Sequence, residues 1–335
     1  NGIYVKEYAF NNEKVKKEFV YNLNNEGYDV VNAHVFATFV ILLLNLPHRN
    51  FRLIITDHVG VYNAQEYECF KEYFEETKKA DAVVTVSLAG RRIFYKAGHR
   101  ENKLHTIHNG VPYQKENVYE KSNKVIYSGR IERNKGAFFL IEAMKEIHKK
   151  HPQVILDMYG DGSGKAELEK LIHNYGMGKY CFIKGFDNNM SEQYKNYDVL
   201  IMPSESESCS YSILEAMMGK CNVLASDVDG NREIIQNEIT GLLFEYGNID
   251  SLILQLDSLL QNEEWAEILR SNAFYAVNKY FTVKNEVDEL EKLFWVFGVE
   301  RYTIYYIEVF IEISEYNFEI MSEPALKKFV KLTDK

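Results

Sequence analysis

Two cations lie at the end of an apolar segment in the sequence YSGRIERNKG, residues 127–136. Arg130 and Lys135 follow a predicted strand and precede a segment of helical period, where Gly129 lets a ligand approach the backbone and a helix N-terminus favours anions. Arginine can bind two phosphate oxygens at once, and lysine supplies a compact charge. The pair could hold a diphosphate and neutralise it as it leaves. Two solvated surface cations are the alternative.

A second candidate site follows the strand predicted to end at Met202. A serine-rich loop leads there into a helix that begins near Tyr211. The backbone N–H groups of Ser210, Tyr211 and Ser212 therefore point at whatever occupies the loop. Because a helix N-terminus attracts negative charge, a phosphate is the expected ligand.

Two carboxylates accompany these amides. Glu207 lies in the loop and Glu215 about one turn into the helix, with seven residues between them. Both could accept hydrogen bonds from the hydroxyls of a sugar or a ribose. The chain has 49 acidic residues, so this spacing also arises by chance and does not establish a site by itself.

Composition excludes several functions. The formal net charge is -10 and no long basic run is present, which argues against a nucleic-acid partner. The longest apolar run, residues 35–46, is too short for a bilayer that needs about 20 residues, and it predicts a buried helix instead. The cysteines show no paired metal spacing and no secretion signal precedes them, so we expect reduced thiols and a cytoplasmic protein: Cys69, Cys181, Cys209 and Cys221.

These candidate residues require a scaffold of strands and helices. Short apolar runs alternate with segments of helical period, which is typical of a parallel α/β sheet. Strands are expected at residues 28–33, 53–56, 82–86, 103–107, 124–128, 154–159, 180–184, 199–202 and 221–225.

A polar segment at residues 112–123 predicts a boundary between two α/β domains. We expect an N-terminal domain over residues 1–115, a nucleotide-binding domain over 120–285, and a crossing helix with a tail of unknown role over 286–335. Within the tail, residues 296–321 favour strand over helix. Ligands bind beyond the carboxyl ends of parallel strands, so a cleft between the two domains is the expected site.

The segments GRIERNKG, LEAMMGKCNVLAS and REIIQNEITGLLF, together with the Glu207–Glu215 spacing, strongly resemble the retaining GT-B glycosyltransferases of family 4. In the first half, YDVVNAHV, ITDHV, AVVTVS and HNGV are similar to the corresponding elements of that family. The resemblance covers about residues 29–281. It implies two Rossmann-like domains that face a cleft, with the N-terminal domain shortened at its start.

Carried over to this chain, the resemblance implies that Arg130 and Lys135 hold the donor diphosphate. Glu215 would bind the ribose hydroxyls, and Glu207 the donor sugar. His58, at the end of a strand, would lie near the transferred sugar or the acceptor.

The same resemblance implies that Phe186 flanks the nucleobase. It also implies transfer of a hexose with retention of configuration and without a metal or other cofactor. We expect a nucleotide-diphosphate sugar as donor, UDP-sugar in preference to GDP-sugar, and a cell-surface glycan or a lipid-linked acceptor.

Two departures from the family pattern concern the site. Ser208, Cys209 and Ser210 replace the usual Gly-Phe-Gly, which keeps the N–H donors but penalises a positive φ. The glycine-rich loop that usually opens the first domain is not found before Tyr28, and this puts acceptor binding and catalysis in question. A non-catalytic transferase-like partner is therefore an alternative.

Another alternative is an NAD-dependent oxidoreductase, because Gly160, Gly162 and Gly164 follow a predicted strand and Asp187 follows a later one. The spacing disagrees with that motif, since the third glycine comes one residue early and Lys165 holds its place.

A basic segment at residues 90–103 contains Arg91, Arg92, Tyr95 and Lys96 on a predicted helix. Such a face could rest on an anionic membrane that carries a lipid-linked acceptor. A solvated helix is the alternative.

Overall fold

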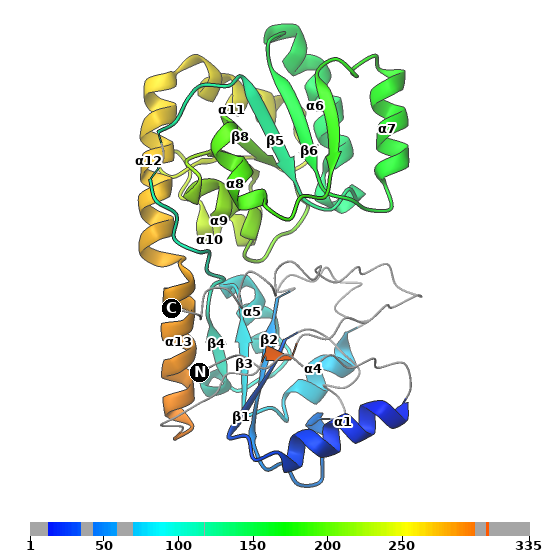
Figure 1. The fold of residues 1–335 in the computed structure, drawn as a ribbon, viewed down its shortest axis with the longest axis vertical. Coiled ribbons are helices and arrows are strands. Elements are labelled where there is room, and N and C mark those ends of the chain that lie inside the picture. The colour runs from blue at the N-terminus through cyan, green and yellow to red at the C-terminus, as the bar shows by residue number, and fades with distance from the viewer. Residues whose placement is uncertain (1–12, 35–42, 59–69, 117, 299–305, 308–335) are drawn as a thin grey trace. The chain divides into compact units, whose positions relative to one another are not determined.

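The structure, a computed structural model, describes residues 13–34, 43–58, 70–116, 118–298 and 306–307. The chain divides into two compact units, residues 1–107 with 289–335 and residues 108–288. Each unit contains one parallel sheet with helices against it (Figure 1). The last residues of helix α13 (Val283–Val296), which lie in the range expected to hold a crossing helix and a tail, belong to the first unit.

The first unit has a five-stranded sheet in the order β11-β1-β2-β3-β4, with all pairs parallel. Its strands are β1 (Val30–His34), β2 (Arg52–Asp57), β3 (Ala82–Thr85), β4 (Leu104–Thr106) and the short β11 (Tyr306–Ile307). Its helices are α1 (Glu13–Asn25), α4 (Lys71–Thr77), α5 (Leu88–Lys96) and the 3-10 helix η1 (Glu101–Lys103).

The central strand β2 is apolar on both of its faces, as expected where helices cover both sides of a parallel sheet. Leu53 and Ile55 pack into the cluster that holds Phe74 of α4 and Phe94 of α5. Ile54, which points to the opposite face, packs with residues from the end of α13. Strand alternation therefore divides the core of this unit into two layers.

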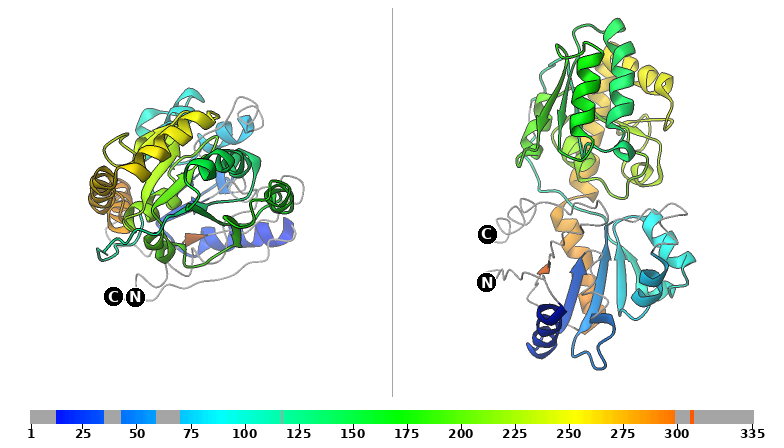
Figure 2. Two further views of the ribbon diagram at one scale, coloured as in Figure 1. Left: turned by 90° about the horizontal axis from the view of Figure 1, so that it is seen from above. Right: turned by 90° about the vertical axis from the view of Figure 1, so that its right-hand side faces the viewer.

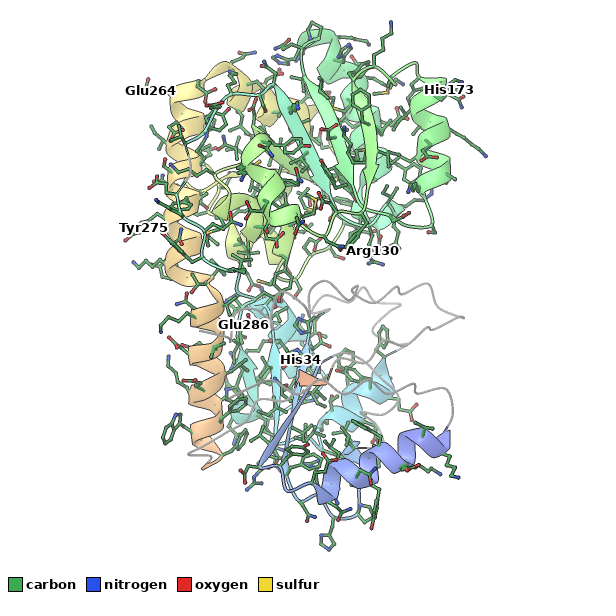
Figure 3. All side chains as sticks on the ribbon, viewed as in Figure 1. His34, Arg130, His173, Glu264, Tyr275 and Glu286 are labelled. Atoms are coloured by element: carbon green, nitrogen blue, oxygen red, sulfur yellow. The ribbon has the colours of Figure 1, made fainter. Side chains whose placement is uncertain are left out.

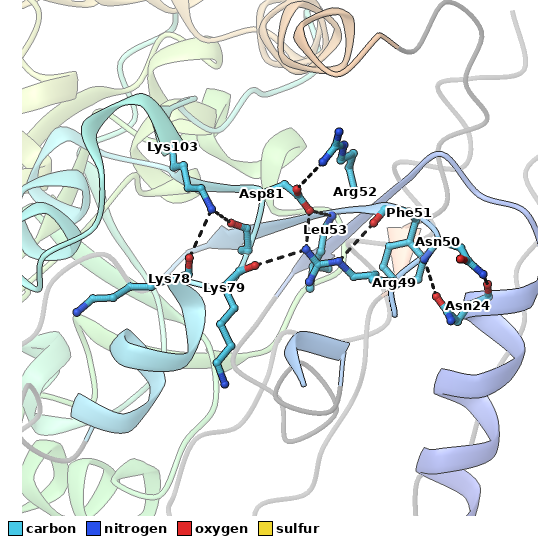
Figure 4. A network of polar contacts seen from close by, with 11 residues as sticks. Asn24, Arg49, Asn50, Phe51, Arg52, Leu53, Lys78, Lys79, Asp81 and Lys103 are labelled. Carbon is cyan, nitrogen blue, oxygen red and sulfur yellow. Dashed lines mark hydrogen bonds and ion pairs between the residues drawn. The ribbon is translucent and has the colours of Figure 1, made fainter. Parts of the chain in front are cut away.

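A half-buried carboxylate ties the start of β3 to β2 (Figure 4). Asp81 accepts hydrogen bonds from the Leu53 amide at 2.9 Å, from Arg49 Nη2 at 2.6 Å and from Arg52 Nη1 at 3.1 Å. Burial acts to raise the pKa of Asp81, but the Leu53 amide and the two arginines outweigh it and hold the pKa below its usual value. The ionised carboxylate is thus part of the fold.

The second unit has a six-stranded parallel sheet in the order β10-β9-β8-β5-β6-β7. Its strands are β5 (Lys124–Ser128), β6 (Ile155–Tyr159), β7 (Cys181–Gly185), β8 (Val199–Met202), β9 (Asn222–Ser226) and β10 (Leu242–Phe244). The sheet lies between two layers of helices (Figure 2).

The helices of this unit are α6 (Ala137–Lys150), α7 (Lys165–Asn174), α8 (Met190–Gln193), α9 (Tyr211–Met218), α10 (Asp229–Ile234), α11 (Ile249–Gln261), α12 (Glu263–Tyr280) and the start of α13. Two 3-10 helices are η2 (Arg133–Lys135) and η3 (Tyr194–Asn196). The chain runs outward from β5 to β7 and then returns to β8, on the other side of β5. The strand order therefore reverses between β5 and β8, where open α/β sheets bind ligands.

The α/β architecture and all nine predicted strands are confirmed, two of them, β5 and β8, with the predicted bounds. Strand β10 was missed because three residues give no measurable period. Most of the helix predicted at residues 35–46 lies outside the described residues, although Leu43 and Leu44 are buried. The strand prediction for 296–321 can be compared only at 296–298, which are not strand, and at 306–307, which are. None of the described helices combines the length and apolarity that crossing a membrane requires.

Replacing Asp81 with Asn should lower the free energy of unfolding by about 1–3 kcal/mol, because the Arg49 charge and the Leu53 amide then lose an ionised acceptor. Urea unfolding at pH 7 measures this change. Since the Asp81 pKa is depressed, its contribution exists above pH ~4 and is lost as the pH falls through the folded-state pKa.

The matched control is Glu101→Gln, which removes the exposed partner of Arg91, 3.4 Å away. An exposed pair of this kind contributes less than about 1 kcal/mol. Equal losses in the two variants would contradict a special role for Asp81.

Candidate functional site

The loops that follow β5 and β8 are in direct backbone contact. Gly136 has φ 74° and lies so close to Pro203 that a Cβ atom would sit 2.1 Å from the Pro203 carbonyl oxygen. Beside this contact, the Glu205 amide donates a hydrogen bond of 2.8 Å to the Asn134 carbonyl. Only glycine combines this left-handed conformation with so close an approach.

This contact brings a predicted cation against a predicted carboxylate. Lys135 Nζ lies 2.8 Å from Glu207 Oε1, and the two side chains are 21% and 13% exposed. Because water reaches the pair only partly, salt screens it less than it screens a surface pair. The two motifs, 72 positions apart in sequence, thus form one charged centre at the switch point of the sheet.

The loop that carries Glu207 is also held by helix α10. A Cβ atom at Gly230 would lie 2.2 Å from the carbonyl oxygens of both Glu207 and Ser208, so the two backbones touch. Within the described part of the chain, none of Ser208, Cys209 and Ser210 has a positive φ. The conformational penalty expected for serine in place of glycine is therefore absent, and Ser210 is the N-cap of α9.

Arg130, in the loop that follows β5, has its own acidic partner. Its Nη1 is 2.9 Å from Glu132 Oε2, and the buried Tyr127 hydroxyl donates a hydrogen bond of 2.6 Å to its carbonyl. Burial, and then the Glu207 carboxylate, raise the pKa of Tyr127, while Arg130 lowers it. Tyr127 thus holds the backbone of the loop that carries Arg130. The sequence analysis missed both Tyr127 and Glu132, and only the proximity of Glu132 to Arg130 could have indicated it.

Glu215 and Ser212 of α9 lie near the end of β5, as their effect on Tyr194 shows. Tyr194 is fully buried in η3. Burial, and then the Glu215 carboxylate, raise its pKa, and the Ser128 and Ser212 hydroxyls act in the opposite direction. Hydroxyl and carboxylate groups of β5, α9 and η3 therefore gather on this side of the switch point.

Phe186 follows β7 and is 58% exposed, as a side chain that stacks on a ligand must be before binding.

The glycine-rich turn after β6 has a structural use. Its Asp161 carbonyl accepts from the Ile131 amide at 2.8 Å, and its Gly164 amide donates to the Ile131 carbonyl at 3.0 Å. These backbone groups already form hydrogen bonds with the neighbouring loop. A dinucleotide site requires backbone groups that bind the ligand instead.

His58 belongs to the first unit, where the structure adds a second histidine. His34 Nδ1 lies 2.9 Å from His58 Nε2, and the two rings are stacked (Figure 3). Burial, and then His58, lower the pKa of His34 to about 3. His34 is therefore neutral near pH 7 and can hold His58 in one orientation. His34 is the last residue of β1, and His58 directly follows the neighbouring strand β2. This equivalent position at the ends of two strands could have indicated His34 from the sequence.

The predicted basic helix is α5, with Arg92, Tyr95 and Lys96 exposed and Arg91 half-buried. Contact of this helix with an anionic membrane stays a prediction.

Two α/β units with parallel sheets, and a charged centre at the switch point of the second, place the chain among proteins with the GT-B fold. The profile of the family "Glycosyl transferases group 1" matches residues 113–275, and that of "Glycosyltransferase Family 4" matches residues 14–115. The two matches overlap at residues 113–115 and together span residues 14–275. The two matches together support a GT-B glycosyltransferase of group 1.

Curated relatives agree with this family. The chain is 24% identical over 289 residues to a poly(glycerol-phosphate) alpha-glucosyltransferase of Bacillus subtilis, covering 84% of this chain and 42% of the relative. It is 24% identical over 249 residues to a poly(ribitol-phosphate) alpha-N-acetylglucosaminyltransferase of Staphylococcus aureus, covering 74% and 48%. The chain thus spans less than half the length of either relative.

Solved structures show the same fold. A mutant of S. aureus TarM, crystallised with fondaparinux, alpha-GlcNAc-glycerol and UDP, has a TM-score of 0.75 at 22% identity, covering 85% of this chain and 59% of TarM. Anabaena HepE in complex with UDP and glucose has a TM-score of 0.75 at 19% identity, covering 84% and 81%.

Replacing Gly136 with Ala should lower the free energy of unfolding by roughly 3 kcal/mol, because a positive φ alone costs about 1–2 kcal/mol and the new Cβ must also push the Pro203 carbonyl away. The matched control is Gly176→Ala, since Gly176 has φ 66° with nothing within 4 Å of a Cβ. Chemical unfolding of both variants measures the difference. A loss at Gly136 no larger than at Gly176 would show that the backbone contact is unimportant.

Proposed function

We propose that this protein transfers a hexose from a nucleotide-diphosphate sugar, in first place a UDP-sugar, to a glycan or lipid-linked acceptor, with retention of configuration and without a metal. The observation that carries the proposal is the Lys135–Glu207 contact of 2.8 Å at the switch point of the sheet. Arg130 on one side and the N-terminus of α9 on the other complete a centre that suits a diphosphate and a sugar.

In this proposal the donor diphosphate binds Arg130 and Lys135, together with the amides of Ser210 and Tyr211. Both cations are paired with carboxylates. Donor binding therefore exchanges a carboxylate partner for a phosphate partner, and Glu207 becomes available to accept hydrogen bonds from the hydroxyls of the donor sugar. Glu215 would bind the ribose, and Phe186 would flank the base.

The reaction breaks the bond between the anomeric carbon and the phosphate oxygen and forms a bond from the same carbon to an acceptor oxygen. The acceptor proton passes to the departing phosphate. Arg130 and Lys135 stabilise the negative charge that develops on the diphosphate, which is the role of a divalent cation in metal-dependent transferases.

Related proteins support the choice of donor and acceptor. HepE was crystallised with UDP and glucose, and TarM with UDP and alpha-GlcNAc-glycerol. The names of the B. subtilis and S. aureus relatives specify poly(glycerol-phosphate) and poly(ribitol-phosphate) as acceptors. These compounds define the first set of substrates to test.

UDP should raise the melting temperature of the chain, and the shift should survive EDTA, because a ligand of the folded state stabilises it. A thermal-shift screen against UDP, GDP, ADP and their sugars measures this effect. Arg130→Ala should abolish the shift. The matched control is Arg133→Ala, which removes an exposed arginine of the same loop that pairs with Glu167. No shift for any nucleotide would favour a non-catalytic transferase-like partner.

Glu207→Gln should lower kcat by about 10²-fold or more, because it weakens interactions with the sugar at which charge develops, while the dissociation constant for UDP changes only a few-fold. Initial rates with UDP-glucose and a glycerol-phosphate polymer measure this loss. Glu205→Gln, an exposed neighbour, is the control and should keep its rate. NMR of the product should show an α-linked sugar, and a β-linked product would exclude retention.

A further inference from the structure

The segment HNGV, residues 108–111, holds the loop that carries Glu207. Asn109 is 3% exposed, and its Nδ2 donates a hydrogen bond of 2.8 Å to the carbonyl of Cys209. This contact joins residues 100 positions apart. A buried side-chain amide thus fixes the peptide unit just before helix α9.

The position of this hydrogen bond determines the direction of a backbone donor. The C=O of Cys209 and the N–H of Ser210 belong to one planar trans peptide unit, in which they point in opposite directions. By holding the Cys209 carbonyl, Asn109 therefore aims the Ser210 N–H away from itself. Ser210 is the N-cap of α9, so this N–H belongs to the group of amides proposed to bind the donor diphosphate.

The Asn109 segment is itself fixed to the junction of α12 and α13. The Val111 amide donates to the Phe281 carbonyl at 2.9 Å, and the Val283 amide donates to the Val111 carbonyl at 3.1 Å. The Gly110 amide donates to Glu286 Oε2 at 2.9 Å. Three hydrogen bonds thus hold the residues on the C-terminal side of Asn109.

Glu286, labelled in Figure 3, is a partly buried acidic side chain among the groups that hold the Asn109 segment. Burial raises its pKa to about 7, against the effect of the Gly110 hydrogen bond. Burial also raises the pKa of the Cys209 thiol to about 12, a hydrogen bond from the Asn109 backbone acts to lower it, and the charges of Glu286, Glu233 and Glu207 add to the rise. His108 is the nearby partner of Glu233, at 3.3 Å. On α13 itself, Lys284 pairs with Asp288.

We propose that Asn109 and Glu286 are positioning residues of the donor site: Glu286 holds the Gly110 amide, this fixes Asn109, and Asn109 orients the Cys209–Ser210 peptide toward the donor diphosphate. The inference rests on the proposed function for its ligand. In this inference the two side chains do not touch the donor. They orient an anion-binding amide before the donor arrives, which lowers the entropic cost of binding.

The test compares Asn109→Ala with Asn278→Ala in the full chain. Asn278 is a partly buried asparagine of α12 whose Nδ2 donates to the Phe274 carbonyl at 2.9 Å, so it loses an equivalent hydrogen bond away from the loop. Isothermal titration with UDP should show an about ten-fold weaker affinity for Asn109→Ala, the effect of one lost hydrogen bond, and no change for Asn278→Ala. Hydrogen exchange without ligand should become faster at residues 205–212 in Asn109→Ala alone.

Glu286 is tested by rescue. Glu286→Ala should reproduce the faster exchange at residues 205–212 and the weaker UDP affinity, because the Gly110 amide loses its acceptor. Glu286→Gln retains an acceptor oxygen and should restore both. A role only in stability would lower the melting temperature without this selective pattern.

The outcomes separate the two proposals. A wild-type chain that binds no nucleotide would overturn the proposed function. Unchanged exchange at residues 205–212 in Asn109→Ala and Glu286→Ala would overturn the positioning role, whether or not UDP binds.

Discussion

The backbone contact between Gly136 and Pro203 is the constraint on which the charged centre depends. Residue 136 has no side chain, so the loops after β5 and β8 approach closely enough for the Asn134–Glu205 backbone hydrogen bond. Lys135 lies within one of these loops and Glu207 just beyond the other contact point. Their pairing therefore follows from the path of the main chain and does not require two flexible side chains to find each other, which lowers the entropic cost of the pair.

The two cations of the charged centre are each compensated by a carboxylate. Lys135 is paired with Glu207 and Arg130 with Glu132, in a chain with a formal net charge of -10. Any attraction for a diphosphate is consequently local, because the net charge of the whole protein repels anions. A phosphate group competes for both cations because it offers more charge and more acceptor oxygens than a carboxylate, and an arginine can bind it through two parallel hydrogen bonds.

The sequence predicted most strands of the two sheets, though not β10, because buried parallel strands are continuous apolar runs. It also supplied Lys135 and Glu207 as candidates, since each follows a strand. Their contact could not be predicted from local pattern, because it depends on β5 and β8 being neighbours, a property of strand order. Asn109 and Glu286 gave no such signal: each acts through a backbone group far away in sequence, and a polar residue that binds backbone looks in a sequence like any surface residue.

The loop Ser208–Cys209–Ser210 has an ordered conformation without the glycines that are usual in the family. Glycine gives a loop access to unusual conformations but increases the entropy lost when the loop is ordered. Here the three residues need no positive φ, and the loop is held from outside, by the backbone at Gly230 and by the amide of Asn109. The conformation of the loop is thus determined by its neighbours. A loop held in this way would lose little entropy on binding an anion, which is what the proposed role of its amides in donor binding requires.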